Sequence, residues 1–405
     1  MSIKKRIHDF FLALFYFERR IDPYYRSTFD RIFQKPLSAL VQALINLKRK
    51  DDHLQIAEEK LLPNEKEITD SIIEQMSLFT HEHYAHSFAL RVGNTKTYGA
   101  VKGEFEILPH LADNLRQGLF KDPKTYPAWV RFAGPGPLAP PDMKDGGILS
   151  IGIKLMGVEG EKLLDEKWTQ DFTGISLSTF TTPNIVENLK LQEQVTAGTP
   201  LFYFINPFDS HFLDGIMQGL YAKVQTSPLE VQYFSCVPYL FGDGQAIHYS
   251  IKPCSNEKTK IPKNPSANYL REAMIKTLDT KEVQFDFMIQ FQTDSYRMPI
   301  EDASVEWPEK LSPFIPVARL RLPMQKFASQ AQLTFAENLS YNPWHCIADH
   351  RPLGNQNRAR RSIYWKLSEL RHSMNKEEMI EPTGMEVFDD GGRETTLNDF
   401  VSIPT

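Results

Sequence analysis

Arg360 and Tyr364 are the two residues of this sequence whose spacing most directly suggests chemistry. They fall in a segment, 357–375, whose composition is typical of a helix. Residues four apart lie on one face of a helix, so the guanidinium can point at the phenol oxygen. A tyrosine phenol ordinarily ionises at about pH 10, but a neighbouring cation favours the phenolate, and ferric iron would stabilise that anion further. The same spacing also occurs in simple pairs on helix surfaces, so its meaning depends on the rest of the chain.

Composition excludes several classes of protein. The chain has 405 residues, 41% of them hydrophobic, which is enough for one large core. Its 46 basic and 51 acidic residues give a net charge of −5, so no overall positive field attracts nucleic acid. The three cysteines, Cys236, Cys254 and Cys346, form no Cys-x-x-Cys pair, which argues against both a disulfide framework and a thiolate zinc site. We therefore expect a cytoplasmic protein without a nucleic-acid partner.

Residues 1–76 are predicted to form a helical extension. The run 10–17 is too short to cross a bilayer, which needs about 20 apolar residues, so we expect no membrane-spanning segment. We favour burial of the first apolar stripe on the rest of the chain or on another subunit of a homo-oligomer. The alternative is peripheral membrane contact through residues 1–20, because basic residues flank the stripe at 4–6 and at 19–20. The two stripes at helical spacing are Ile7, Phe10, Phe11, Leu14 and Phe17, and then Leu37, Leu40, Val41, Leu44 and Ile45.

Residues 77–375 change to short β-rich runs separated by glycine and proline, a pattern typical of a closed barrel or a sandwich. We predict an α+β fold in which helices are added to an antiparallel sheet, followed by a C-terminal tail over 376–405. The predicted strands cover 101–108, 128–132, 148–156, 231–236, 247–251, 283–292 and 317–322. The predicted helices cover 183–196, 209–225, 269–277 and 357–375.

A series of motifs follows in a distinctive order between Leu78 and Asn375. The motifs are Arg91-Val-Gly-Asn94-Thr-Lys96-Thr97-Tyr98-Gly99, Pro127-Ala-Trp-Val-Arg131-Phe132-Ala133, Gly147-Ile-Leu-Ser-Ile-Gly-Ile-Lys154-Leu155, the stretch from Trp307-Pro308 to Leu320, and Arg360-Arg-Ser-Ile-Tyr364. In this order the chain resembles the haem catalases and their relatives, which include the allene oxide synthases. The resemblance implies a catalase-like antiparallel β-barrel with added helices.

The resemblance also implies a haem b cofactor and gives roles to single residues. Tyr364 is expected to be the iron ligand, and Arg360 its charge partner. Arg91 and Arg131 are expected to pair with the haem propionates, a role for which guanidinium groups are well suited. Phe132, next to Arg131, is expected to contact the same cofactor.

The distal position, where catalases have a histidine, can be matched in two ways. Matching Arg91 and Gly99 puts Asn94 there and requires one inserted residue before the next strand. A gap-free match puts Tyr98 there, preceded by Thr97, and we favour it because this pair resembles the threonine-histidine pair of the allene oxide synthases. Neither an asparagine amide nor a tyrosine phenol is a base at neutral pH.

Two further positions depart from the catalase pattern. Ala133 stands where catalases have the serine that supports the histidine, and Ser176 stands at or beside the distal asparagine. Efficient dismutation of hydrogen peroxide is therefore not expected. On the other side of the haem, His345 is an alternative to Tyr364 as the iron ligand.

The function we expect is that of a haem enzyme acting on organic, fatty-acid-type hydroperoxides, as a peroxidase or as an isomerase or dehydratase. In such reactions distal side chains need only orient the peroxide by hydrogen bonds. The alternative is a haem-binding or sensing protein of the same fold that turns over no peroxide.

Overall fold

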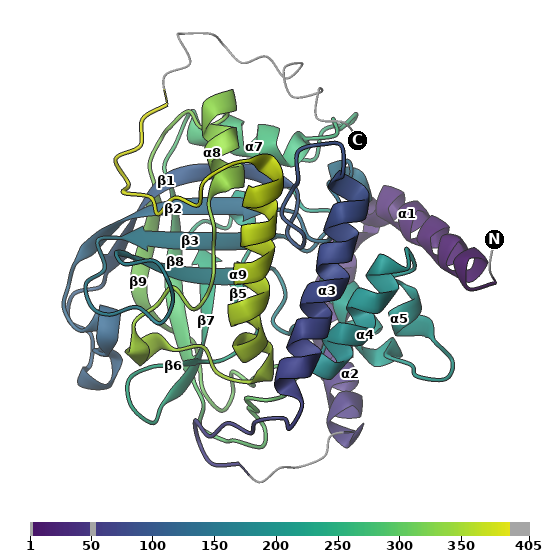
Figure 1. The fold of residues 1–405 in the computed structure, drawn as a ribbon, viewed down its shortest axis with the longest axis horizontal. Helices are drawn as coiled ribbons and strands as arrows, with labels where there is room; N and C mark the ends of the chain where they lie inside the picture. The colour runs from purple at the N-terminus through teal and green to yellow at the C-terminus, as the bar shows by residue number, and fades with distance from the viewer. Residues whose placement is uncertain (1–2, 49–53, 389–405) are drawn as a thin grey trace.

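An antiparallel β-barrel forms the centre of the computed structural model, which describes residues 3–48 and 54–388 (Figure 1). Its strands run in the order β5-β4-β3-β2-β1-β9-β8-β7, and pairing of β5 with β7 closes the barrel, while the short β6 pairs with the other end of β7. This architecture confirms the predicted α+β barrel with added helices. The strands are β1 (Thr97–Ile107), β2 (Thr125–Ala133), β3 (Ser150–Met156), β4 (Thr169–Ile175), β5 (Tyr233–Phe234), β6 (Tyr239–Leu240), β7 (Ala246–Pro253), β8 (Val283–Phe291) and β9 (Ile315–Leu322).

Aromatic side chains fill the barrel interior. The ring centroids of Phe172 and Phe287 are 4.8 Å apart, and those of Phe105 and Phe287 are 5.2 Å apart. Successive side chains of a strand point to opposite faces, so the residues between these aromatics lie on the outer surface. The interior is a packed core, and the barrel therefore presents its outer face to ligands.

Three helices cover one side of the barrel, namely α3 (Glu65–Tyr84), α4 (Ile185–Thr196) and α9 (Asn355–Asn375) (Figure 1). They share an apolar cluster that includes Ile72 and Ile363. The domain boundary expected between residues 76 and 77 falls inside α3, so the extension and the barrel region are not separated at that point. The other helices of the body are α5 (Phe202–Ile205), α6 (Phe212–Tyr221), α7 (Tyr269–Leu278) and α8 (Gln330–Asn338).

The N-terminal segment forms a helical rod that consists of α1 (Ile3–Phe29), a π-helical turn (Asp30–Gln34) and α2 (Lys35–Lys48). While α2 packs on α6, α1 projects from the body of the molecule (Figure 1). The apolar stripe of α1 faces away from the barrel, which corrects the expectation that it is buried on the rest of the chain. No helix in the described part of the chain has the length and hydropathy needed to cross a membrane. The residues that α1 buries are instead His8, Arg19, Asp22 and Arg26.

The first part of the predicted C-terminal tail lies on the barrel. Trp129 donates a hydrogen bond from Nε1 to Glu386 Oε2 (2.8 Å), and the ring of Phe388 lies 5.9 Å from that of Trp129. The rest of the tail, 389–405, lies outside the described residues.

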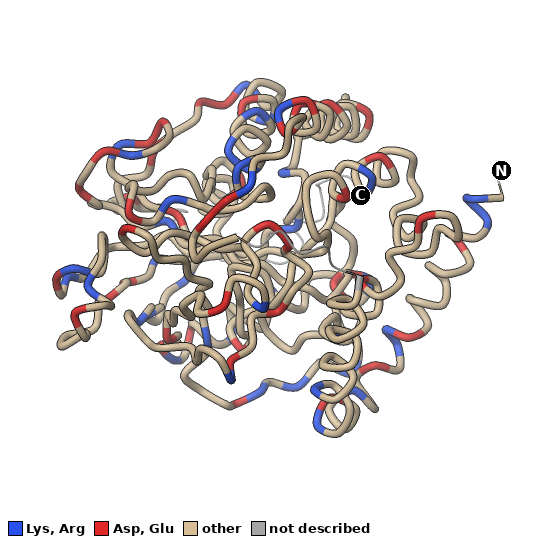
Figure 2. Tube along the Cα trace, turned by 90° about the horizontal axis from the view of Figure 1, so that it is seen from below, with Lys and Arg blue, Asp and Glu red and all other residues tan. Residues whose placement is uncertain are grey.

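Charged residues of both signs are interspersed over the body of the molecule (Figure 2), and one group of them is almost buried around Arg358. Arg358 Nε lies 2.6 Å from Glu65 Oε1, and its Nη1 lies 2.7 Å from Glu59 Oε1 and 2.9 Å from Glu301 Oε1. Burial opposes ionisation of Glu59, but hydrogen bonds from Gly354, Arg351 and Arg358 lower its pKa below the ordinary value. This cluster ties the segment before α3 to the start of α9.

Arg358→Met is expected to lower the free energy of unfolding by about 3 kcal/mol at neutral pH, because it removes the cation that Glu59, Glu65 and Glu301 share and leaves Arg351 paired with Glu59 alone. The difference from the parent protein should shrink as the pH falls through the lowered pKa of Glu59, where protonation removes the ion pair. Urea unfolding at pH 7 and at pH 4 measures both effects. The matched control is Arg297→Met, whose partner Asp294 is 3.7 Å away at an exposed site, and it should cost less than about 0.5 kcal/mol. Equal losses for the two variants would contradict the role assigned to the cluster.

Candidate active site

A cavity of about 430 Å³ lies between the outer face of the barrel and the covering helices. Its volume is within the range of about 300–1,000 Å³ that is typical of small-molecule sites. The barrel contributes Arg131 from β2, Gly152 from β3 and Thr173 from β4, which are neighbours in the β-ladder. A side chain is excluded at Gly152, because an added Cβ atom would lie 2.8 Å from the ring of Tyr341, another wall residue.

α9 forms the opposite wall with a single face of the helix. Positions three, four and seven residues apart lie on one face, so this spacing turns a whole row of side chains toward the barrel. Arg360 and Tyr364 stand in that row, as the sequence predicted. The α9 residues on the wall are Arg360, Ile363, Tyr364, Leu367, Ser368 and Arg371.

Arg360 is held over the ring of Tyr364, with the guanidinium carbon 4.9 Å from the ring centroid. Its Nη1 donates to Asn357 Oδ1 (2.8 Å) and its Nη2 to Thr173 Oγ1 (2.7 Å), which fixes the plane of the group. Burial disfavours the charge of Arg360, but the phenols of Tyr364 and Tyr239 beside it raise its pKa above the ordinary value. A charged guanidinium is thus fixed next to one tyrosine phenol of the cavity.

Three more arginines, Arg91, Arg131 and Arg371, line the same cavity. Burial, together with the positive charge of Arg91, lowers the pKa values of Arg131 and Arg371 to about 9. Arg91 Nη1 and Arg131 Nε have no hydrogen-bond partner among the described residues. The Glu337 carboxylate attracts all three charges, but it leaves these two donors unpaired. This part of the cavity is therefore suited to carboxylate groups of a ligand.

Asn94, not Tyr98, lies on the cavity wall. The ladder between β1 and β2 pairs Thr97 with Ala133 and then Gly99 with Phe132, so Tyr98 is the extra residue of a β-bulge. That bulge supplies the inserted residue that the Asn94 alignment requires. The favoured gap-free match is corrected accordingly, since Tyr98 is fully buried in the barrel core with its hydroxyl 3.4 Å from an Asp145 carboxylate oxygen.

Thr97 and Asn94 are both connected to Arg131. Arg131 Nη2 donates to Thr97 Oγ1 (2.5 Å) and to the Asn94 carbonyl (3.0 Å). Thr97 is buried and therefore positions the arginine, and it does not line the cavity. Asn94 adopts a left-handed backbone conformation, φ 58°, which asparagine tolerates better than most residues.

No histidine, aspartate or glutamate of the described chain lines the cavity. The wall carries hydroxyl and amide groups instead, among them Asn94, Ser150 and Ser235. Apolar residues of α3 and α4, such as Met76 and Val195, form the side away from the barrel. The cavity therefore offers hydrogen bonds and apolar contact but no carboxylate or imidazole base.

Comparison with solved structures places this architecture among known folds. A bacterial catalase matches with a TM-score of 0.54 and 16% identity over 86% of this chain and 71% of its own. A fungal catalase matches with a TM-score of 0.57 and 14% identity, covering 88% and 74%. Catalase A from Saccharomyces cerevisiae matches with a TM-score of 0.58 and 12% identity, covering 88% and 77%. The chain has the fold of the catalases.

Sequence comparison adds nothing to this finding. No family model matches the chain, and no curated protein matches it either. The catalase fold is therefore shown by structure alone, and the chemistry of the cavity has to be argued from its own residues.

Phe132 occupies a different place in this catalase fold from the one expected. Neighbouring residues of a strand point to opposite faces, so Arg131 faces the cavity while Phe132 faces the barrel interior. There Phe132 is fully buried, with its ring centroid 6.1 Å from that of Tyr233. The expectation that it contacts a cofactor is corrected.

Two wall residues that the structure reveals, Arg371 and Tyr341, were missed by sequence reasoning. Arg371 follows Tyr364 by two helical turns, so the spacing on α9 contained a signal for it. Tyr341 comes from the loop after α8, for which the sequence gives no periodicity. Burial and the nearby Asp171 carboxylate raise the pKa of Tyr341 well above its ordinary value, so its phenol stays neutral.

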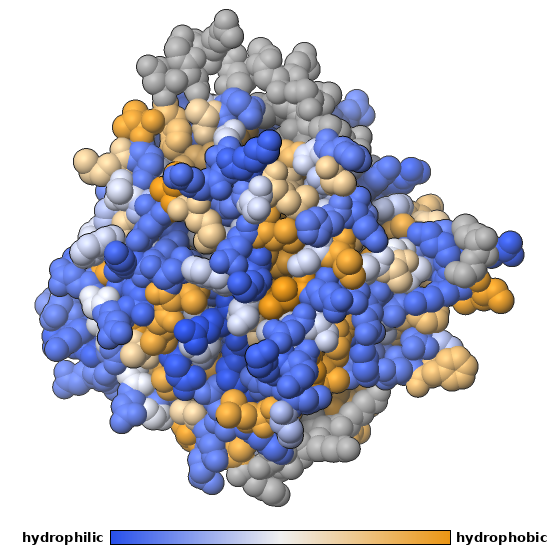
Figure 3. All heavy atoms as spheres, in the orientation of Figure 1, coloured by the Kyte–Doolittle hydropathy of each residue, from blue (hydrophilic) through white to orange (hydrophobic). Residues whose placement is uncertain are grey.

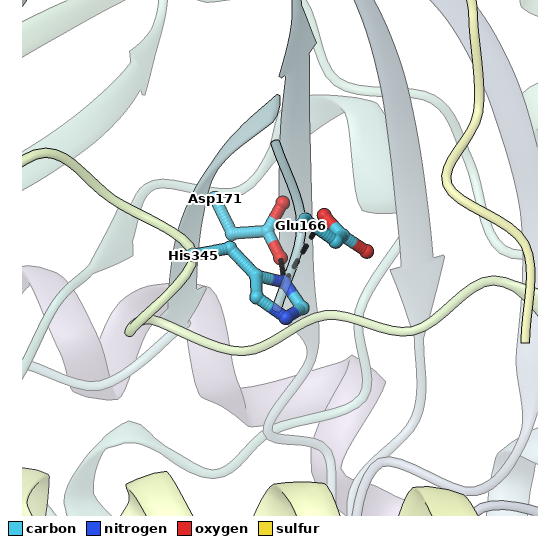
Figure 4. A group of neighbouring side chains, drawn as sticks. All are labelled: Glu166, Asp171 and His345. Carbon is cyan, nitrogen blue, oxygen red and sulfur yellow. Dashed lines mark hydrogen bonds and ion pairs between the residues drawn. The ribbon is translucent and has the colours of Figure 1, made fainter. Parts of the chain in front are cut away.

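His345 does not lie on the cavity wall. Its Nδ1 is 2.8 Å from Asp171 Oδ2 (Figure 4). Its Nε2 is 2.9 Å from Asp165 Oδ1. Glu166, Asp171 and His345 are close enough together to share a metal ion, but the buried ammonium of Lys154 contacts both carboxylates, with Nζ 2.8 Å from Asp171 Oδ1. The cluster is a buried charge network, and its geometry gives no support to His345 as an iron ligand.

Substitution of His345 should change how stability depends on pH. Burial and Lys154 disfavour the imidazolium, but Asp165 and Asp171 raise the pKa of His345 from 6.5 to about 9. Because the folded pKa is the higher one, the imidazolium stabilises the fold below pH 6.5 and loses this effect as the pH rises through 9. Between pH 6 and 9.5 the parent should lose about 2–3 kcal/mol more than His345→Gln, as measured by urea unfolding. His248→Gln is the control with the opposite sign. Because burial lowers the pKa of His248 from 6.5 to about 3, the parent should gain up to about 1 kcal/mol relative to this variant as the pH rises from 6 past 6.5.

Proposed function

We propose that the cavity binds haem b, with Tyr364 as the iron ligand and Arg360 stabilising its phenolate. Arg91, Arg131 and Arg371 would pair with the two propionate carboxylates. The observation that carries this proposal is a group of three arginines in one cavity with a guanidinium-paired tyrosine. Two of the three, Arg91 and Arg131, have donors without a hydrogen-bond partner among the described residues. The haem ring is apolar and suits the apolar residues of the wall, while its two propionate carboxylates can pair with the arginines.

We infer that the protein acts on organic, fatty-acid-type hydroperoxides and is poor at dismuting hydrogen peroxide. Bound ferric haem supplies the chemistry that breaks a peroxide O–O bond. The amide of Asn94 can donate a hydrogen bond to a peroxide oxygen but cannot take up its proton. The apolar residues Met76, Leu191 and Val195 on the wall favour a substrate with a hydrocarbon chain. Isomerase or dehydratase chemistry needs no external reductant, whereas a peroxidase reaction does.

A second candidate is a haem-binding or sensing protein without turnover. It is favoured by the lack of a carboxylate or imidazole on the wall of the described cavity. Peroxide assays on the full-length protein loaded with haemin distinguish the two candidate functions. Loss of the conjugated-diene absorbance of a polyunsaturated fatty-acid hydroperoxide, with little oxygen release from hydrogen peroxide, supports the enzyme. No consumption of either peroxide by the loaded protein supports the second candidate.

Tyr364→Phe is expected to abolish the charge-transfer absorption of a ferric tyrosinate in the haemin-loaded protein, because it removes the phenolate ligand. Arg360→Met should keep the ligand but weaken haemin binding by about 10–100-fold, the usual cost of losing a group that supports a metal ligand. Visible spectra and haemin titrations measure these effects. Tyr341→Phe is the matched control, because it removes a neutral phenol from the same wall and should retain the spectrum. A parent-like spectrum for Tyr364→Phe, or its loss in His345→Gln, would contradict the assignment.

Asn94→His is expected to raise oxygen release from hydrogen peroxide by about 10²–10⁴-fold in the loaded protein, because it adds a base to the cavity wall. Tyr98→His is the comparison that distinguishes the two alignments. It should give no gain and should lower stability by about 1–3 kcal/mol, because it puts a polar ring into the barrel core. A gain in Tyr98→His alone would restore the gap-free alignment.

A further inference from the structure

The helical rod formed by α1 and α2 has an apolar outer face with a positive charge. Along α1 the exposed apolar positions follow one another at intervals of three and four residues, which keeps them on one side of the helix. Hydrophobic atoms are visible on the projecting end of α1 at the right edge of Figure 3. The large exposed side chains of the face are Ile3, Ile7, Phe10, Phe11, Leu14, Phe17, Ile21, Tyr24, Tyr25, Ile32, Phe33, Leu40, Leu44 and Leu47.

The charged residues of 3–47 that are exposed, and not partly buried, are all basic. They are Arg6, Arg20, Arg31 and Lys35. The acidic residues of the same segment, at positions 9, 18, 22 and 30, are buried or partly buried. The outer face of the rod therefore combines apolar and aromatic side chains with positive charge.

Polar contacts on the inner side fix this orientation of α1. Arg19 Nη2 donates to the Gly146 carbonyl (3.2 Å), and Asp22 Oδ2 accepts from the Val224 amide (2.9 Å). Arg26 also reaches the body, where its Nη1 donates to the Gly219 carbonyl (3.3 Å). A surface helix normally buries its apolar side and exposes its charged side, and α1 does the reverse. Rotating α1 to bury the phenylalanines would break these contacts.

We propose that the outer face of the α1–α2 rod docks into the interface of a bilayer that contains anionic lipids. Helices that lie in a membrane surface combine aromatic and aliphatic residues with flanking arginine and lysine, as this face does. Each basic group near an anionic surface contributes about 1 kcal/mol, or about fivefold in binding. The described helices do not span a membrane, so the contact is peripheral.

Charge argues for a lipid surface rather than a second copy of the chain. A symmetric dimer through this face would place the same patch of each copy against the other. The exposed basic residues of the rod would then approach one another. Asp9, the most accessible acidic side chain of the rod, already lies 3.6 Å from Lys5. Anionic lipid headgroups supply the missing negative charge.

The rod also contacts the wall of the cavity described above. Lys5 Nζ donates to the Gly198 carbonyl (3.2 Å), and Lys4 Nζ lies 5.0 Å from the ring centroid of Phe202. Between these two contacts lies Pro200, which lines the cavity. Docking of the rod would bring this wall close to the lipid surface, whatever the cavity holds.

Flotation of the full-length protein with vesicles tests the proposal. The protein is expected to float with vesicles of phosphatidylcholine and phosphatidylserine, and more weakly with pure phosphatidylcholine or in high salt. Phe10→Gln combined with Phe17→Gln should reduce binding at least tenfold, because burying a phenylalanine contributes about 1.5–3 kcal/mol. Arg6→Gln combined with Arg20→Gln should reduce binding to the anionic vesicles by about fivefold per residue, with no effect on neutral ones.

Matched controls lie off the rod. Phe208→Gln changes a phenylalanine that is 96% exposed, and Lys263→Gln removes an exposed positive charge, and both should float like the parent. Absence of flotation in the parent, or equal losses in the rod variants and the controls, would overturn the proposal. A concentration-dependent dimer that is lost in the Phe10 and Phe17 variant, without lipid binding in the parent, would overturn it in favour of a second copy. Circular dichroism of each variant shows that the fold is retained.

Discussion

Three guanidinium groups, those of Arg91, Arg131 and Arg371, line one cavity between the barrel and its covering helices. Burying like charges together costs free energy, which appears here as lowered pKa values for Arg131 and Arg371. Backbone carbonyls take part of the hydrogen bonding, but donors of Arg91 and Arg131 stay unpaired among the described residues. The strand β2, the segment before β1 and the helix α9 have to be held rigidly to keep these groups together. The packed barrel core behind β2 and the ion cluster around Arg358 at the start of α9 supply that rigidity.

The two sides of the cavity carry different kinds of side chain. On α9 the guanidinium of Arg360 lies over Tyr364, 4.9 Å from its ring centroid. Across the cavity, burial and Asp171 raise the pKa of Tyr341, so that phenol is neutral. On the barrel side the wall offers amides and hydroxyls, which orient a ligand but do not take its proton. A haem enzyme with such a wall would have no side-chain base to take up the proton of a peroxide, so its reaction would depend on how the bound substrate is oriented. For that reason we propose a hydroperoxide with a hydrocarbon chain, and not hydrogen peroxide, as the substrate.

Sequence alone could predict those features that follow from local periodicity. The spacing of Arg360 and Tyr364 predicted a shared helix face. The short β-rich runs predicted a barrel or a sandwich, and the resemblance to the catalases decided for the barrel. Features that depend on pairing between distant segments were not accessible. The bulge at Tyr98 exists only in the ladder between β1 and β2, so the choice between Asn94 and Tyr98 could not be made beforehand. Likewise the apolar stripe of α1 could be predicted from the spacing of its residues. The outward direction of the stripe could not, because it is set by polar contacts of Arg19, Asp22 and Arg26 with distant parts of the chain.

The cavity wall is assembled from segments far apart in the chain, since Arg91 and Arg131 precede β3 whereas Tyr364 and Arg371 lie on the last helix. Synthesis proceeds from the N-terminus at about 5–20 residues per second, so the roughly 270 residues between Arg91 and Tyr364 take about 15–55 s to make. Throughout that time the first two arginines are present without the helix that completes their site. A cofactor held by all these residues can therefore be captured only after translation of α9, which makes insertion a late step of biogenesis. The barrel itself is complete only once β9 has been made, because this strand joins β1 to β8, so core and cavity are both finished near the end of synthesis.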